Sequence, residues 1–201
     1  NRRYPRISYR MLQSETRGAA ETILLGTSII ENERQHLPLV CLDGDTFYRS
    51  NILSKIRKST QNGLICFEDE STEPIYSYTK IDKQKQILEI AEKKKISTLA
   101  NTGCYFFSSS EIFSNSASVV IEENIRDRGE FYVSTVIKRM IRDEYNFDAI
   151  EISESDFEIL GTPLQVKLFC SKEAMQSGNL RICFDLDNTL VSYPKLTGDY
   201  S

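Results

Sequence analysis

Strand-like and helix-like segments alternate along this sequence, and this alternation restricts the fold more than any other feature. Short apolar runs bounded by turn residues predict strands, and stretches with apolar residues at helical spacing predict helices. Strands that alternate with helices are typical of an α/β domain, in which helices cover the faces of a sheet. We expect strands at 38–42, 64–67, 75–79, 87–91, 101–107 and 147–152, and helices at 19–30, 50–58, 131–145 and 162–175.

The overall composition removes several classes of function. The 201 residues carry a net charge of -4, which leaves no basic excess to neutralise many phosphates, so we expect no nucleic-acid partner. No apolar stretch approaches the roughly 18 residues that a membrane span requires, so we expect no membrane partner. The five cysteines are scattered without a C-x-x-C pair, which favours buried, reduced thiols in a cytoplasmic protein. The single histidine, His36, lies in a polar stretch and receives no role.

An acidic pair, Asp43 and Asp45, directly follows the apolar run 38–42. Such a run predicts a strand buried on both faces, and in an open α/β sheet ligands bind at the carboxyl ends of strands. Two carboxylates there suit Mg²⁺, which fills its other coordination positions with water and substrate phosphates. Gly44 between them leaves the backbone free to turn. Taken alone, the pattern is about equally typical of an acidic Asp-Gly hairpin turn.

Six short motifs follow one another along the chain. They are Thr16-Arg17-Gly18-Ala19-Ala20-Glu21-Thr22, Leu42-Asp43-Gly44-Asp45, Glu92-Lys93, Asn101-Thr102-Gly103, Gly129-Glu130-Phe131-Tyr132 and Leu160-Gly161-Thr162-Pro163. In this order they resemble the sugar-phosphate nucleotidyltransferase family. The similarity covers roughly residues 1–170, and the order of the motifs makes it fairly specific although each one is weak.

The resemblance implies a role for particular side chains. Asp45 would be the primary metal ligand with Asp43 as a helper, and Lys93 would hold the acceptor phosphate, so Asp45 and Lys93 are the expected catalytic residues. The expected substrate-binding residues are Gly18, Ala19 and Glu21 for the nucleotide base, Asn101 and Gly103 for the sugar pocket, and Glu130 for sugar hydroxyls.

Each of these positions also has a purely structural explanation. Lys93 belongs to a run of three lysines, and such runs are usually solvated surface. Glu130 could stabilise the first turn of its helix through the helix dipole. Asn101 could shape a turn, and Gly18 could simply begin a helix.

The resemblance also implies a fold and a domain plan. We expect a Rossmann-like fold of the GT-A type with a mixed, mostly parallel central sheet, whose N-terminal strand and Gly-rich phosphate loop would lie before Asn1. Residues 1–176 would form this domain, with the turn-forming residues 177–179 as a linker. Where the family often places a second metal-binding Asp the sequence has Ile159, and either Asp156 or Glu158 could substitute. The family's Asp near the end of the Gly-Glu motif is Thr135.

A second acidic motif follows the linker. Residues 180–184 form an apolar run that ends at Asp185, and Asp187 and Thr189 follow at alternate positions. This D-x-D-x-T pattern resembles the first motif of haloacid-dehalogenase-like (HAD) phosphatases. The resemblance implies that Asp185 is a nucleophile that forms an aspartyl-phosphate, that Asp187 is an acid and base, that both bind Mg²⁺, and that Thr189 donates to phosphate. Residues 180–201 would then begin a second domain.

The function expected from the sequence is nucleotidyl transfer. A metal-dependent enzyme would join a nucleoside triphosphate to a phosphorylated sugar or similar small acceptor, as part of a bifunctional protein that serves the building blocks of surface polysaccharides. The alternatives are a GT-A glycosyltransferase that uses the same two acids, a phosphatase whose preceding domain only binds or oligomerises, and a truncated scaffold. The sequence leaves a homo-oligomer, the base and the acceptor open.

Overall fold

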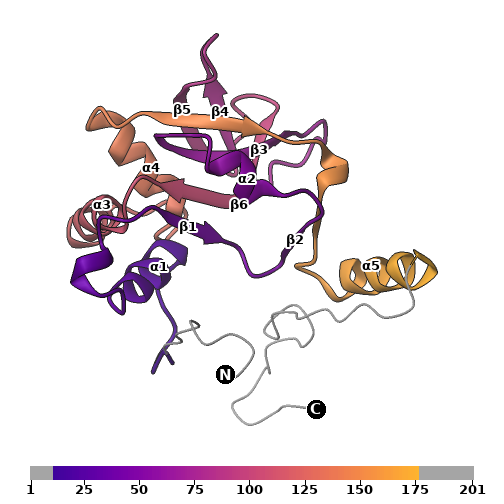
Figure 1. The fold of residues 1–201 in the computed structure, drawn as a ribbon, viewed down its shortest axis with the longest axis horizontal. Helices are drawn as coiled ribbons and strands as arrows, with labels where there is room; N and C mark the ends of the chain where they lie inside the picture. The colour runs from indigo at the N-terminus through magenta and orange to yellow at the C-terminus, as the bar shows by residue number, and fades with distance from the viewer. Residues whose placement is uncertain (1–10, 177–201) are drawn as a thin grey trace.

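A six-stranded sheet runs through residues 11–176, which are the part of the chain that the computed structural model describes (Figure 1). The strands are β1 (Leu39–Leu42), β2 (Thr46–Tyr48), β3 (Asn62–Glu68), β4 (Ser77–Ile81), β5 (Ile87–Glu92), β6 (Leu99–Phe107), β7 (Phe147–Glu151) and β8 (Phe157–Ile159). The helices are α1 (Ala19–Thr27), α2 (Ile52–Ile56), α3 (Ser110–Glu122), α4 (Val133–Arg142) and α5 (Pro163–Gln176), and short 3-10 turns occupy Asn32–Arg34 and Glu154–Asp156.

The strand order is β5-β4-β6-β3-β7, with β1 also paired to β6. The expected α/β fold with a mixed sheet is therefore confirmed. The expectation of a mostly parallel sheet is wrong for the described strands. Among them, only β3 and β7 pair in parallel. Strands β1, β3 and β4 run antiparallel to β6, and β5 runs antiparallel to β4. Periodicity in a sequence reports burial and not strand direction, so it could not reveal this.

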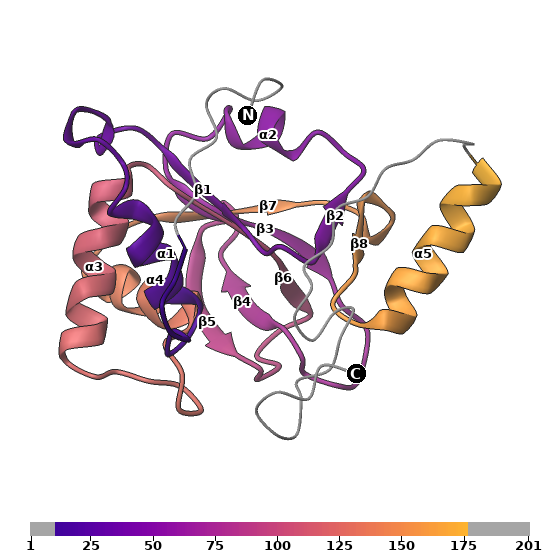
Figure 2. The same cartoon turned by 90° about the horizontal axis from the view of Figure 1, so that it is seen from below.

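Helices cover one face of the sheet more fully than the other. Figure 2 shows α1, α3 and α4 gathered on one side, where their apolar residues and those of the sheet form the larger core. In α4 the buried residues Val133, Val136, Ile137 and Met140 recur at helical spacing, as the sequence predicts. The opposite face packs against α2 and the segment that leads into β8, through Ile52, Ile56, Ile152 and Phe157.

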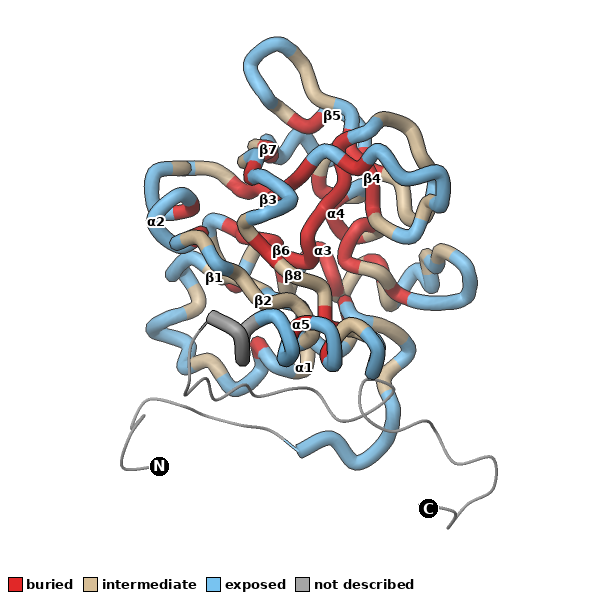
Figure 3. Tube along the Cα trace, turned by 90° about the vertical axis from the view of Figure 1, so that its right-hand side faces the viewer, coloured by how far each residue is buried: buried red, intermediate tan, exposed pale blue. Residues whose placement is uncertain are grey.

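The C-terminal segment is attached through a small second sheet. β2 pairs antiparallel with β8, and α5 packs on this pair through Phe47 and Phe169, whose ring centroids are 5.0 Å apart. Buried positions concentrate in β3, β4 and β6, whereas most of residues 163–172 in α5 are exposed (Figure 3). No helix within residues 11–176 combines the length and the apolarity needed to cross a membrane.

Several local expectations require correction. β1 is half-buried and its last residue, Leu42, is exposed, so it is not a strand buried on both faces. Cys66 and Cys104 are buried as expected, but Cys170 is exposed. Helix α3 and strands β2 and β8 were not expected from the sequence. The linker 177–179 and the segment with Asp185, Asp187 and Thr189 lie outside the described residues.

Candidate active site

One edge of β6 changes partner partway along the strand, and a cleft opens there. β4 pairs with β6 at Ala100, and β1 pairs with β6 from Cys104 onward. Between these points two residues bulge out, because the β3 register passes directly from Cys104 to Asn101. The buried Asn101 side chain closes the bulge: its Oδ1 accepts from the Gly103 N–H at 2.8 Å, and its amide donates to two backbone carbonyls.

The bulge carries the loop with Asp43 and Asp45. The Asp43 N–H donates to the Gly103 carbonyl at 2.8 Å, and the Leu160 N–H donates to the Asp45 carbonyl at 2.7 Å. Each carboxylate lies against a glycine. A Cβ at Gly103 would come within 2.4 Å of Asp43 Oδ2, and a Cβ at Gly161 within 2.7 Å of Asp45 Oδ2. Gly44 has an ordinary φ and open space around it, so the glycines that this loop requires are Gly103 and Gly161.

The cleft has a volume of about 350 Å³ and an acidic lining. Among the described residues, its charged side chains are the carboxylates of Asp43, Asp45 and Glu92, and none of its lining residues is a Lys or Arg. The remainder of the lining comprises Ala19, Thr46, Ile75, Tyr76, Ser77, Asn101, Thr102, Gly103, Tyr105, Tyr132, Val133, Ile159 and Gln165. Three carboxylates without a lining cation repel any anionic ligand, so an anionic substrate requires an added cation there.

The charges of the cleft act on Asp43 itself. Asp43 is exposed by its surface area, although protein atoms surround much of its carboxyl group. This partial burial, followed by the negative charges of Asp45 and Glu92, raises the pKa of Asp43 to about 6. An ionised Asp43 is therefore unfavourable in the folded protein until a cation neutralises it.

We expect Asp43→Asn to stabilise the metal-free protein at pH 7.5 more than at pH 4.5. The folded-state pKa lies above the ordinary value of 3.8, so ionisation of Asp43 removes stability as the pH rises through about 6, and Asn carries no such charge. Thermal unfolding of both proteins in a chelator, at the two pH values, measures the difference. An equal shift of the midpoint at both pH values would contradict this electrostatic picture.

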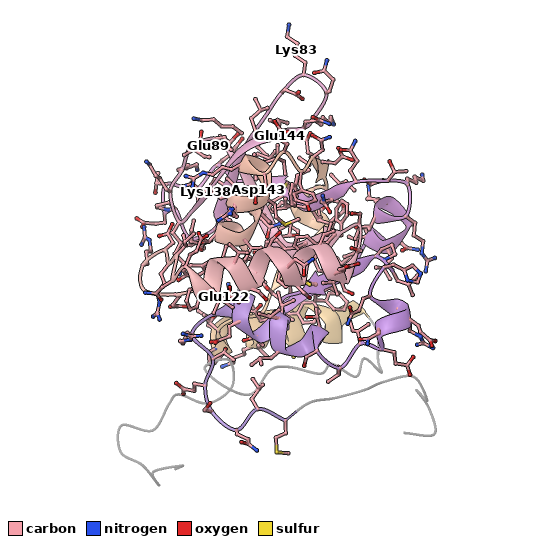
Figure 4. The ribbon with its side chains drawn as sticks, turned by 90° about the vertical axis from the view of Figure 1, so that its left-hand side faces the viewer. Lys83, Glu89, Glu122, Lys138, Asp143 and Glu144 are labelled. Atoms are coloured by element: carbon pink, nitrogen blue, oxygen red, sulfur yellow. The ribbon has the colours of Figure 1, made fainter. Side chains whose placement is uncertain are left out.

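A second pocket, in which basic side chains slightly outnumber acidic ones, adjoins the acidic cleft. It has a volume of about 380 Å³. The lining of this basic pocket carries Lys93, Lys94, Arg128 and Lys138 together with the acids Glu89, Glu92 and Asp127. Glu92 lines both cavities. Figure 4 labels Lys138 on α4 and Glu89 on β5, which both line this pocket. Acidic and basic regions therefore lie side by side, with Glu92 at their boundary.

Lys93 is held at this boundary by specific contacts. Its Nζ donates to the Tyr132 hydroxyl at 3.3 Å and lies 5.2 Å from the centroid of that ring. The Arg128 guanidinium donates to the Lys93 carbonyl at 3.0 Å. Lys93 therefore lines the basic pocket and not the acidic cleft, while its contact Tyr132 does line the cleft.

The family model described as "Nucleotidyl transferase" matches residues 5–157, which is most of the chain. The chain belongs to the nucleotidyl transferase family. No curated protein matches its sequence.

Solved structures agree with this nucleotidyl transferase fold. A nucleoside-diphosphate-sugar pyrophosphorylase from Vibrio cholerae RC9 has a TM-score of 0.63 at 23% identity, and the match covers 80% of this chain and 67% of that one. An inositol-1-phosphate CTP transferase from T. maritima has a TM-score of 0.59 at 12% identity, and the match covers 82% of this chain and 65% of that one. A putative glucose-1-phosphate thymidylyltransferase from Bacillus anthracis has a TM-score of 0.57 at 18% identity, and the match covers 88% of this chain and 67% of that one. The chain thus spans about two thirds of each.

Among the residues expected at the nucleotide side of this nucleotidyl transferase, the structure brings only Ala19 to the cleft. Gly18 packs against the backbone of Phe131, where an added Cβ would lie 2.6 Å from the Phe131 nitrogen. Glu21 accepts from the backbone N–H and the guanidinium of Arg17 and lines a different cavity. The expected contact of Glu21 with a base at this cleft is therefore not supported, because the start of α1 uses its carboxylate.

On the sugar side, the structure brings two of the three expected residues to the cleft. Asn101 and Gly103 line the cleft, but the Asn101 amide is already used by the bulge. Glu130 is exposed, its backbone pairs with Asp127, and it is not among the residues that line the cleft. Tyr132 and Glu92 are there instead. Glu92 belongs to the Glu92-Lys93 motif, but the resemblance to the family assigns a role only to Lys93.

Neither acid that could have replaced the family's second metal ligand reaches the cleft. Glu158 forms ion pairs with Arg49 and Lys172, at 3.2 and 2.7 Å. Asp156 Oδ2 accepts from the Ser153 N–H and caps a 3-10 turn. Strand alternation in β8 instead brings Ile159 to the cleft. Within residues 11–176, no group of three or more His, Cys, Asp or Glu side chains is arranged to hold a metal ion.

Proposed function

We propose that this chain carries most of the catalytic domain of a metal-dependent nucleotidyltransferase of the sugar-phosphate type. The observation that supports the proposal is the acidic cleft: Asp43, Asp45 and Glu92 line it, and within residues 11–176 no Lys or Arg lines it to balance them. A triphosphate cannot approach such a site without a compensating positive charge. Membership in the nucleotidyl transferase family makes a triphosphate the expected anion.

The residues present fit Mg²⁺. This ion is often held by one or two protein carboxylates and completes its coordination with water and substrate phosphates. The family resemblance makes Asp45 the primary ligand and Asp43 the helper. Both residues line the cleft, each with a glycine next to its carboxylate, which is compatible with these roles. When bound, the ion would supply the positive charge that a triphosphate requires.

The chain's own residues would then act mainly by positioning. An oxygen of the acceptor phosphate attacks the α-phosphorus, the bond from that phosphorus to the β-phosphate bridging oxygen breaks, and pyrophosphate leaves with the electron pair. Lys93, whose Nζ contacts the Tyr132 hydroxyl in this structure, would hold the acceptor phosphate as a point charge. No covalent intermediate on the protein is needed, so binding and orientation carry the catalysis.

A screen of the full-length protein tests this function. Each of CTP, UTP, GTP and dTTP is incubated with glucose 1-phosphate, N-acetylglucosamine 1-phosphate, mannose 1-phosphate or phosphocholine in Mg²⁺. We expect pyrophosphate to appear with at least one pair and to disappear when the acceptor is omitted. Release of a nucleoside diphosphate from a nucleotide sugar, without pyrophosphate from any triphosphate, would instead identify a glycosyltransferase.

We also propose that a HAD-like phosphatase domain begins at residue 180. The support is the D-x-D-x-T motif of Asp185, Asp187 and Thr189 after an apolar run. In the full-length protein, Asp185→Asn is expected to abolish phosphate release from p-nitrophenyl phosphate, because it removes the nucleophile. Pyrophosphate formation should be unchanged in the same variant. Phosphate release that survives the substitution would refute the role of Asp185.

A further inference from the structure

Two buried serines hold the same oxygen of Glu92. The hydroxyl of Ser77, on β4, donates to Glu92 Oε2 at 2.5 Å, and the hydroxyl of Ser134, in the first turn of α4, donates to it at 2.7 Å. The two serines are only 7% and 3% exposed. The carboxylate is therefore fixed from two different elements of the fold.

This arrangement leaves the other oxygen of Glu92 available. Among the described residues, Glu92 Oε1 has no hydrogen bond to the protein, while Oε2 takes both serines. Hydrogen bonds to an ionised acceptor are stronger than those between neutral groups, so two of them restrict the rotation of the carboxylate effectively. A fixed carboxylate oxygen at the edge of a cavity is suited to accept a hydrogen bond from a ligand hydroxyl.

The position of Glu92 indicates which substrate would supply the hydroxyl that Glu92 Oε1 accepts from. It lines the acidic cleft together with Asp45, and it lines the basic pocket together with Lys93. If the triphosphate is bound at the acidic pair and the acceptor phosphate at Lys93, the body of the acceptor lies beside Glu92.

We propose that Ser77 and Ser134 are positioning residues that orient Glu92 toward a hydroxyl of the acceptor. The inference rests on the proposed nucleotidyltransferase function and assigns part of its acceptor selectivity to two side chains that act through a third. Neither serine needs to touch the acceptor, because each acts only through Oε2.

The test compares Ser134→Ala and the double variant Ser77→Ala/Ser134→Ala with Ser110→Ala in the full-length protein. Ser110 is a matched control, because it is also 3% exposed, also begins a helix, and also donates one hydrogen bond, to the Gln35 carbonyl at 2.9 Å. The substrates are the NTP and acceptor that react in the wild-type screen, together with deoxy forms of that acceptor.

We expect Ser134→Ala to raise the acceptor KM about tenfold and to leave the NTP KM within about twofold, since one charge-assisted hydrogen bond is lost. The double variant should show a larger rise. In the wild type, one deoxy acceptor should react much more slowly than the parent, and this discrimination should shrink in both variants. Ser110→Ala should change neither KM.

The possible outcomes separate this inference from the proposed function. A wild-type protein that forms no pyrophosphate with any pair overturns the function, and this inference with it. A wild-type protein that turns over, with Ser134→Ala and the double variant matching Ser110→Ala in both KM values and in deoxy discrimination, overturns the inference alone. An equal rise in both KM values would also overturn it, because it indicates general damage to the fold.

Discussion

Asp45→Asn is expected to reduce pyrophosphate formation by at least about 100-fold while the fold stays intact. The substitution removes the charge that would bind the cation, and electrostatic stabilisation of this kind usually contributes at least this much to turnover. Asn has nearly the same shape, and the backbone carbonyl of residue 45, which accepts from Leu160, is unchanged. Initial rates and thermal unfolding of the purified full-length protein measure both effects.

Asp143→Asn provides the control for this variant. Asp143 ends α4 on the face shown in Figure 4 and forms an exposed ion pair with Arg139 at 2.9 Å. Exposed pairs contribute little to stability, so this variant should turn over and unfold like the wild type. Near-normal turnover in Asp45→Asn would refute the metal-binding role of that residue, whatever the control shows.

The second large effect is expected for Gly161→Ala, which should lower turnover about 10- to 100-fold without lowering stability. An added Cβ would lie 2.7 Å from Asp45 Oδ2 and would push the carboxylate out of its place. Small displacements of a group that orients substrate are costly for the rate. Gly161 has an ordinary φ, and every close atom belongs to the Asp45 side chain, so the backbone itself tolerates alanine.

Gly44→Ala separates displacement of Asp45 from a general effect of alanine in this region. It lies between the two acids, also has an ordinary φ, and a Cβ there would meet no atom within 4 Å. We expect it to retain most of the turnover. If Gly161→Ala were as active as Gly44→Ala, the glycine behind Asp45 would have no part in placing the carboxylate.

The sequence predicted those elements whose signal is local and strong. Helix α4 shows a continuous apolar stripe, and its predicted range contains the observed one. Helix α3 was missed because its serine-rich sequence has weak helix propensity, although Phe113, Ala117 and Val120 do recur at helical spacing. β2 and β8 are three-residue strands that exist because each pairs with a distant partner, and no local pattern reports such a pairing.

The same distinction applies to the site. Asp43 and Asp45 could be found because a strand followed by two acids is a local pattern. Whether Glu130 or Glu92 faces the cleft depends on how separate segments meet, and a motif alone does not decide this. The fixation of Glu92 needs hydroxyls from positions 15 and 42 residues away in the chain, so the sequence gives no signal for it.

Binding of Mn²⁺ tests the central claim most directly, because it does not depend on knowing the acceptor. Water-proton relaxation enhancement distinguishes Mn²⁺–triphosphate bound to the full-length protein from the same complex free in solution, and it is measured with CTP, UTP, GTP and dTTP in turn. If Asp43 and Asp45 hold the cation, the wild type will remove Mn²⁺–triphosphate from solution, and Asp43→Asn/Asp45→Asn will bind it at least about tenfold more weakly. Equal binding by the two proteins would contradict the account.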